Sequence, residues 1–322
     1  MLLVIFGINS YFDPFADFFY LTGWRPHPIV RIDNYADVKF KSGLLKYLPR
    51  NYIDAAVFGS SRPLRINSEC PGFKELGKHT FNLAMQGASL ATVDRFVRMA
   101  CAKNPNMLVI IGLDFFAFDT PPKPIIFYLD SKKIPAAWGD ALMRLIDIQT
   151  LQESLKDPNR PTRHRMLPDG NALFNPTQKE KDAVPAYLEK YSQQTIAEIP
   201  AFKNYVYDPT QIEWLKKLKK DHPHIIFFIN PESKWYHPPL DNSRLAPEVR
   251  TWRNDVATLG GVVDFSECKE ITDNSSMYLD EHHYLAPAGN LIMEDIANAA
   301  AGRPLQHGKI LQPDTSTPKS TP

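Results

Sequence analysis

Short apolar runs alternate along the chain with segments in which apolar residues recur at helical spacing. Runs that end in turns predict buried strands, and the segments between them predict amphipathic helices. The expected strands cover residues 53–58, 79–84, 107–114, 225–230 and 262–265, and the expected helices cover residues 89–103, 247–259 and 287–301. Strands that alternate with helices favour a doubly wound parallel sheet covered on both faces, which is a three-layer α/β fold.

The alternation breaks between residues 115 and 223. Polar and proline-rich connections there join three expected helices over 137–155, 183–199 and 211–221. We therefore expect an α/β domain over residues 53–303 that carries a mostly helical insertion over about 115–223, which could form a lid. Residues 1–52 would form an N-terminal lead-in, and the polar, proline-bearing residues 304–322 a disordered tail.

Composition narrows the classes of function. The 37 Lys+Arg against 36 Asp+Glu leave a net charge of +1, which argues against a nucleic-acid binder because such proteins need surplus basic side chains. Cys70, Cys101 and Cys268 are too few and too scattered for a disulfide framework or a zinc site. We favour three buried small hydrophobes, although one pair could bridge in an oxidising compartment.

The N-terminus allows two interpretations. Residues Met1 to Ile8 are apolar, but Asn9 and Ser10 end the run well short of the roughly 20 residues that span a bilayer. The run also lacks the basic region and the small-residue cleavage site of a secretory signal. It is either a first buried helix or the last turns of a membrane anchor that begins before Met1. No other segment of the sequence is apolar and long enough to span a membrane.

Two segments far apart in the chain carry the candidate chemistry. Gly59-Ser60-Ser61 follows a predicted buried strand, which puts its hydroxyls at the carboxyl edge of the sheet. Asp280-Glu281-His282-His283 supplies Asp-x-x-His spacing near the last helix. A serine hydroxyl attacks a carbonyl well only beside a positioned base, so the two segments together predict a Ser-His-Asp hydrolase or acyltransferase.

These segments resemble the SGNH hydrolase superfamily. The closer resemblance is to its extracytoplasmic branch, which acylates cell-envelope polysaccharides and includes alginate O-acetylation proteins and the D-alanyl transfer protein of teichoic acids. It covers about residues 53–114 and 223–300, and Asn9-Ser10-Tyr11-Phe12-Asp13-Pro14 looks like the stretch that follows the anchor in that branch. The resemblance implies a flavodoxin-like, SGNH-type sheet and a periplasmic or otherwise extracytoplasmic domain, anchored to the membrane by its N-terminus.

The resemblance also implies roles for single residues. The family's Gly-Asp-Ser aligns with Gly59-Ser60-Ser61, which makes Ser61 the nucleophile and leaves Ser60 as the alternative. The family's Asp-x-x-His makes His283 the base and Asp280 its orienter, with His282 as a competitor one residue away.

The oxyanion hole departs from the family pattern. The second family block implies that Gly87 donates a backbone N–H, but Gly112-Leu113-Asp114 stands where the family has Gly-x-Asn. An ionised Asp114 would repel an oxyanion, so Asp114 would have to be protonated or serve another purpose, or the second donor would come from Asn82 or the backbone.

Other polar and aromatic residues allow two readings each. Arg62 could hold an anionic group of the substrate or begin a helix in solvent. Trp235, Tyr236 and His237 follow the fourth strand, where their rings could contact sugars or pack under a loop. The adjacent histidines have poor spacing for two metal ligands on one helix face, so we expect no metal, and we expect no cofactor.

The leading hypothesis is a serine O-acyltransferase or esterase that acts on an acylated envelope glycan, an exopolysaccharide or a small acyl ester. A membrane-bound acyl-transfer protein would be a natural partner, and nucleic acid would not. The alternative, favoured by Asp114, is a catalytically silent SGNH-like domain that binds polysaccharide or serves assembly. A third hypothesis is an ordinary secreted lipase-like esterase.

Overall fold

The computed structural model describes most of the chain. The described residues are 1–13, 17–24, 34–120, 142–155, 164–166, 170, 172–174, 176–199 and 202–313.

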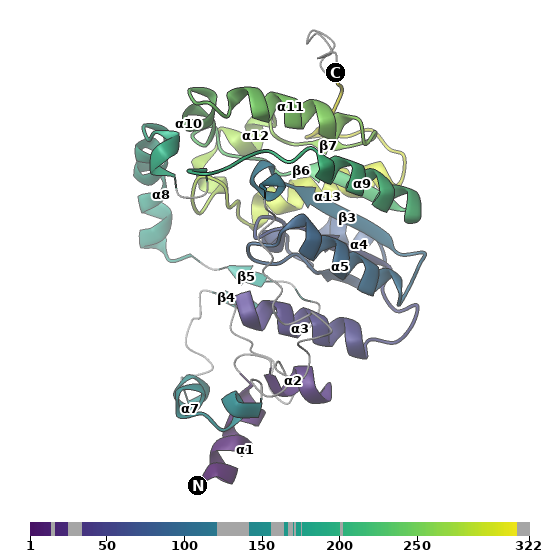
Figure 1. Cartoon of the computed structure of the whole chain (residues 1–322), viewed down its shortest axis with the longest axis vertical. Coiled ribbons are helices and arrows are strands. Elements are labelled where there is room, and N and C mark those ends of the chain that lie inside the picture. The colour runs from purple at the N-terminus through teal and green to yellow at the C-terminus, as the bar shows by residue number, and fades with distance from the viewer. Residues whose placement is uncertain are drawn as a thin grey trace.

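A six-stranded sheet forms the centre of the fold, with the strand order β2-β1-β3-β6-β7-β8 (Figure 1). Its strands are β1 (Ala55–Phe58), β2 (Thr80–Asn82), β3 (Leu108–Leu113), β6 (Ile225–Ile229), β7 (Val263–Asp264) and β8 (Lys309–Ile310). All neighbouring strands are parallel except β8, which runs antiparallel to β7. The five expected strands are present with slightly shorter ends, and the α/β class with a mostly parallel sheet is confirmed.

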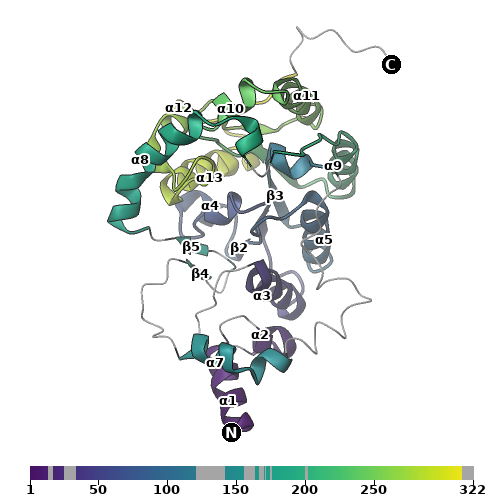
Figure 2. The ribbon, with the colours of Figure 1, turned by 60° about the vertical axis from the view of Figure 1, so that its left-hand side comes forward.

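Helices cover both faces of this sheet. Successive side chains of its strands point to opposite faces and are buried in two separate clusters. Ala56 and Phe58 belong to one cluster and Val57 to the other. The first cluster includes residues of α3 (Asn34–Tyr47), α5 (Leu90–Cys101), α9 (Thr210–Asp221) and α11 (Ala246–Ala257). The second includes residues of α4 (Pro71–Glu75), α12 (Lys269–Thr272) and α13 (Ala286–Ala300). Figure 2 shows these helices around the sheet.

The α9 helix differs from its expected place in the insertion. Its apolar stripe of Ile212, Leu215 and Leu218 is buried in the first cluster, together with the strands. Such a stripe at helical spacing needs a partner surface, and here the sheet provides it. The helix therefore connects β3 to β6 as part of the layered fold.

The rest of the insertion is described in pieces. It contains η2 (Phe115–Phe118), α7 (Ile148–Ser154), β4 (His164–Met166), β5 (Ala172–Phe174), α8 (Gln178–Ser192) and η3 (Ile196–Glu198). Helix α8 begins earlier than expected because Thr177 and Glu180 form a capping box. The antiparallel β4–β5 pair was not expected, since strands of three residues are too short to show a periodic pattern. The first part of the helix expected over 137–155 lies outside the described residues.

The N-terminal helices α1 (Leu2–Phe12) and α2 (Asp17–Thr22) explain the Asn-x-x-x-Asp spacing. The Asn9 side-chain amide donates to the carbonyls of Leu145 and Asp147, both at 3.1 Å, which ties α1 to the segment that begins α7. The Asp13 carboxylate accepts the N–H groups of Phe18 and Phe19 at 2.9 and 2.8 Å, and burial raises its pKa to about 7. These two residues therefore fix the packing of α1, which lies beside α7 at the opposite end of the molecule from α11 (Figure 1).

The first turn of α1 is exposed, whereas Ile5 and Asn9 are buried. Met1, Leu2, Leu3 and Val4 are 91%, 58%, 85% and 64% exposed. The interpretation of this run as a buried first helix therefore fits only the later part of α1. Among the described helices, none combines the length and the apolar character needed to cross a bilayer.

Disorder was expected over residues 304–322, but residues 304–313 are ordered. β8 pairs with β7, Leu311 is buried, and the Asp295 carboxylate of α13 accepts the N–H groups of Gln306, His307 and Gly308. The polar composition of the segment did not reveal this acceptor, which lies elsewhere in the chain. Residues 314–322 lie outside the described part.

The three cysteines, Cys70, Cys101 and Cys268, are all buried and free. Burial raises the pKa of each thiol, so they behave as small apolar side chains.

Candidate active site

A tight turn presents the two serines at the carboxyl end of β1. Gly59 has φ of 140°, and a Cβ there would lie 2.9 Å from the carbonyl oxygen of Gly112 on β3. Only glycine fits both constraints, so the turn depends on this residue. Ser60 and Ser61 follow directly, ahead of the short helix η1 (Pro63–Arg65).

A serine, a histidine and an aspartate meet at this turn. The Ser61 Oγ lies 2.7 Å from His283 Nε2, and His283 Nδ1 lies 2.7 Å from Asp280 Oδ2. The other Asp280 oxygen accepts the N–H groups of His283 at 2.8 Å and of His282 at 3.1 Å. This is the hydrogen-bond arrangement of a Ser-His-Asp triad. The structure therefore brings together the three residues that the sequence proposed.

The loop that carries the histidine is closed at both ends. Tyr278 and Tyr284 form an antiparallel bridge, and the N–H of Leu279 donates to the carbonyl of His283 at 2.8 Å. The loop lies between η4 (Ser275–Met277) and α13, and both tyrosines are buried. The His283 ring is therefore set by backbone pairing as well as by Asp280.

The protonation states suit a general base. Burial lowers the pKa of His283 to about 4, against the opposing effect of its hydrogen bond to Asp280. Burial alone would raise the pKa of Asp280, but the hydrogen bond and the charge of His283 lower it well below its usual value. Near neutral pH the imidazole is therefore neutral and the carboxylate ionised, as proton abstraction from Ser61 requires.

The geometry separates the two serines. The Ser60 hydroxyl donates to Asp114 Oδ2 at 2.5 Å and accepts the N–H of Arg62 at 3.2 Å, and Ser60 is buried. Its oxygen thus has structural partners, whereas Ser61 is the residue beside the imidazole.

The geometry also separates the two histidines. His282 Nδ1 lies 2.9 Å from Glu281 Oε1, so His282 is paired with a different carboxylate. The Tyr187 hydroxyl of α8 donates to the other oxygen of Glu281 at 2.5 Å. His282 therefore belongs to a second pair that the insertion contacts.

Asp114 lies in a buried charge network. Its Oδ1 accepts from Arg62 Nη1 and from Asn230 Nδ2, both at 2.9 Å, and Arg62 Nη1 also donates to Glu232 at 2.6 Å. Burial raises the pKa of Asp114, while Arg62 and the Ser60 hydroxyl oppose that rise. Burial alone would lower the pKa of Arg62, but Asp114 and Glu232 raise it well above its usual value.

This network changes two expectations. Asp114 does not line the cavity beside Ser61, so its charge balances Arg62 instead of facing an oxyanion. Arg62 is 1% exposed, so the solvated helix start proposed for it is wrong. Its guanidinium lies 5.0 Å from the ring centre of Phe116 and 5.2 Å from that of Tyr236.

The Asn82 side chain is engaged elsewhere. Its amide donates to the carbonyls of Pro63 at 2.9 Å and of Ile66 at 3.0 Å, which uses both of its hydrogens. Asn82 therefore supports the turn after Ser61 and does not supply the second oxyanion donor.

The N–H group of Gly87 differs in its hydrogen bonding from the other N–H groups of its loop. Five neighbouring N–H groups all donate hydrogen bonds. The pairs are Leu83 to Val57 O, Ala84 to Asn82 Oδ1, Met85 to Gly59 O, Gln86 to Asp37 Oδ2 and Ala88 to Met85 O. Within the described part of the chain, those of Gly87 and Ser61 have no protein acceptor. Both residues line one cavity, so their N–H groups are the candidate backbone donors there.

The cavity beside Ser61 has a volume of about 190 Å³. Its lining residues are Ser61, Arg62, Gly87, Phe116, Tyr191, Ile199, Phe202, Tyr236, Glu281 and His282. Tyr191 of α8 stacks on Tyr236, with parallel rings whose centres lie 6.2 Å apart. The insertion thus forms a wall of the cavity, and Tyr236, of the three aromatic residues singled out after the fourth strand, lines it.

Several residues of the site were not singled out from the sequence. Glu232, which pairs with Arg62, follows β6 at the carboxyl edge, the position that already pointed to Ser61, so its place in the chain was a usable signal. Tyr191 and Phe202 had no comparable signal, because they come from the insertion and reach the site only through its packing.

The same loop provides a candidate metal cluster. Donor atoms of Asp280, His282 and His283 lie within 4.8 Å of one another. Both ring nitrogens of His283 are already used, by Ser61 and by Asp280. A metal ion would therefore have to replace the triad contacts.

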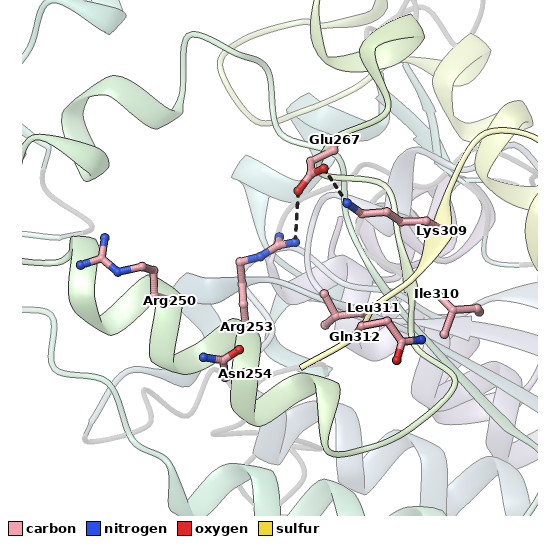
Figure 3. Close-up of a pocket in the computed structure, with 8 residues that line it drawn as sticks. All are labelled: Arg250, Arg253, Asn254, Glu267, Lys309, Ile310, Leu311 and Gln312. Atoms are coloured by element: carbon pink, nitrogen blue, oxygen red, sulfur yellow. Dashed lines mark hydrogen bonds and ion pairs between the residues drawn. The ribbon is translucent and has the colours of Figure 1, made fainter. Parts of the chain in front are cut away.

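A second hollow of about 310 Å³ lies along α11 and β8 (Figure 3). Arg253 and Lys309 are both directed at Glu267 (Figure 3). Their side-chain nitrogens lie 3.8 and 2.5 Å from its carboxylate oxygens. Glu267 thus pairs with two of the basic side chains that line this hollow, and none of the triad residues lines it.

Comparisons with protein-family models, with curated proteins and with solved structures gave no match.

Proposed function

We propose that this protein is a serine esterase or O-acyltransferase of SGNH type that acts on acylated glycans of the cell envelope or on related acyl esters. The observation that carries the proposal is the Ser61–His283–Asp280 chain, with both hydrogen bonds at 2.7 Å. The SGNH assignment is supported by the order of the parallel strands, β2-β1-β3-β6-β7. When only these five strands are counted in chain order, this is the flavodoxin-like order 2-1-3-4-5.

In the first half of the reaction, the Ser61 oxygen attacks the acyl carbonyl while its proton passes to His283 Nε2. Asp280 stabilises the resulting imidazolium. The N–H groups of Ser61 and Gly87 would bind the oxyanion of the tetrahedral intermediate. Collapse of that intermediate breaks the bond to the leaving alcohol, which takes the proton from His283, and the acyl group stays on Ser61.

In the second half, water or a sugar hydroxyl gives its proton to His283 and attacks the acyl-enzyme. The bond to Ser61 then breaks, and Ser61 recovers its proton from His283. The aromatic wall of Phe116, Tyr191, Phe202 and Tyr236 favours a short apolar acyl group in the cavity. Exclusion of water by the insertion would favour transfer to a sugar over hydrolysis.

The proposal places the domain outside the cytoplasm, held at a membrane that also contains an acyl-transfer partner. The exposed apolar side chains of Met1, Leu2, Leu3 and Val4 support it. Vesicle flotation of the protein and of a Leu2→Ser, Leu3→Ser variant tests this part: we expect only the parent chain to float.

Hydrolysis of p-nitrophenyl acetate tests the chemistry. We expect Ser61→Ala to lose at least about 10³-fold in kcat, because the nucleophile cannot be replaced by its neighbours. Ser60→Ala is the matched control and keeps measurable turnover. EDTA leaves the rate of the parent protein unchanged, whereas a metal-dependent reaction would stop. If the parent protein has no activity, the silent polysaccharide-binding alternative is favoured.

A further inference from the structure

We propose that the buried ion pair between Asp37 and Lys41 positions the oxyanion loop, which we define as residues 84–87. The two residues lie four apart on α3, so they share one face of the helix. Lys41 Nζ lies 3.1 Å from Asp37 Oδ1, and neither side chain is exposed. This inference rests on the proposed function, because it concerns the loop that holds Gly87.

Each member of the pair holds one peptide unit of the oxyanion loop. Lys41 Nζ donates to the carbonyl oxygen of Ala84, and Asp37 Oδ2 accepts the N–H of Gln86 at 3.0 Å. The two peptide units directly before that of Gly87 are therefore fixed from α3. Gly87, with φ of 61°, is the third residue of a turn that the Ala88 N–H closes on the carbonyl of Met85 at 3.3 Å, so its N–H belongs to a turn built on those two units.

The opposite side of the loop is held by the nucleophile turn. The N–H of Met85 donates to the carbonyl of Gly59 at 3.0 Å. The loop is thus fixed between α3 and the turn that carries Ser61. This arrangement sets the distance between the two backbone donors of the proposed oxyanion hole, which must match the position of the developing charge.

Stability alone does not account for this pair. Two charges taken out of water carry a desolvation cost that their attraction often fails to offset, and apolar replacements of buried pairs are frequently neutral. The pair instead supplies a directed donor and a directed acceptor to backbone groups that would otherwise be unsatisfied. Asp37 and Lys41 are therefore positioning residues.

Variants of the full chain test the inference. Lys41→Met removes the donor to Ala84, and Asp37→Asn removes the charge that holds Lys41. Lys39→Met is the matched control, because Lys39 lies on the same helix and forms an equally buried pair, with Asp17 of α2 at 2.6 Å. The assays are p-nitrophenyl acetate hydrolysis and its inhibition by phenylboronic acid, whose tetrahedral adduct places an oxygen in the oxyanion hole.

We expect Lys41→Met to lower kcat at least about tenfold while KM stays within about twofold of the parent value. Inhibition by phenylboronic acid should weaken by a factor similar to that in kcat. Asp37→Asn shows a smaller loss of the same kind, and Lys39→Met changes kcat by less than about twofold. Equal kcat values for Lys41→Met and Lys39→Met, or a change confined to KM, would overturn the inference.

Amide hydrogen exchange provides a readout that needs no activity. The peptide over residues 84–88 should be protected in the parent chain and lose protection in Asp37→Asn, while peptides of β3 keep theirs. Unchanged protection in Asp37→Asn, or fast exchange of the Gln86 amide in the parent chain, contradicts the positioning of the oxyanion loop by the Asp37–Lys41 pair, even if Lys41→Met does not fold. If the parent chain is inactive but shows the expected exchange, the proposed function is rejected, whereas the positioning of residues 84–87 by the Asp37–Lys41 pair is supported.

Discussion

Replacement of Asp280 by asparagine is the sharpest test of how the triad works. Asp280 accepts three hydrogen bonds, two from backbone N–H groups and one from the His283 ring. An asparagine can keep the backbone bonds through its carbonyl oxygen, but its NH₂ group then faces His283 Nδ1. The imidazole must accept there, which places its proton on Nε2, the nitrogen that should take the proton from Ser61.

The expected loss is large because the wrong tautomer removes the base while the geometry is kept. The same change in a well-studied serine protease lowers kcat about 10⁴-fold, which corresponds to about 5.5 kcal/mol of transition-state stabilisation. We expect a similar factor for Asp280→Asn, measured as the rate of fluorophosphonate labelling or of p-nitrophenyl acetate hydrolysis.

Glu281→Gln is the control for this change, because it alters the neighbouring carboxylate, which is paired with His282. It should cost far less activity than Asp280→Asn. A loss below about tenfold in a folded Asp280→Asn protein, or equal losses in both variants, would refute the assignment of His283 as the base.

Three further predictions follow from charge and burial. The labelling rate should rise as pH increases through about 4 and then stay level to neutral pH, because burial lowers the pKa of His283 to about 4; a midpoint near 6.5 would contradict this. Because this pKa lies below the ordinary value of 6.5, the unfolded chain binds more protons between these pH values, so His283 makes stability fall as pH drops, by up to about 3 kcal/mol. Urea unfolding of the parent chain and of His283→Gln at about pH 4 and pH 6.5 measures this contribution, and we expect the variant to lack it. Arg62→Met should lower the free energy of unfolding by about 3–5 kcal/mol, since it leaves Asp114 buried without its cation, and an unchanged urea midpoint would contradict the network.

The sequence was informative where a function depends on local spacing. A buried strand that ends in Gly59-Ser60-Ser61 predicts its own position at the sheet edge, and Asp280 to His283 form one short loop that carries base and orienter together. The meeting of these segments at one edge of the sheet follows from the α/β alternation, whereas the strand order does not, because doubly wound sheets occur in more than one order.

The sequence was less informative where a role depends on distant partners. From the sequence, Arg62 could bind an anionic group or begin a helix in solvent; its burial becomes evident only when Asp114, Glu232 and two aromatic rings are placed around it. Asn82 reads as a donor until the carbonyls of Pro63 and Ile66 are seen to use its amide. The Tyr191 wall and the Asp37–Lys41 pair come from segments with no chemical motif, so only tertiary packing shows their relation to Ser61.

The central claim is that Ser61 is an activated nucleophile. Mass spectrometry of the protein after treatment with a fluorophosphonate tests it most directly, with the modified residue located by peptide mapping. We predict one adduct on Ser61, retained in Ser60→Ala and lost in Ser61→Ala and His283→Gln. No adduct on the parent protein, or an adduct that persists in Ser61→Ala, would contradict the account.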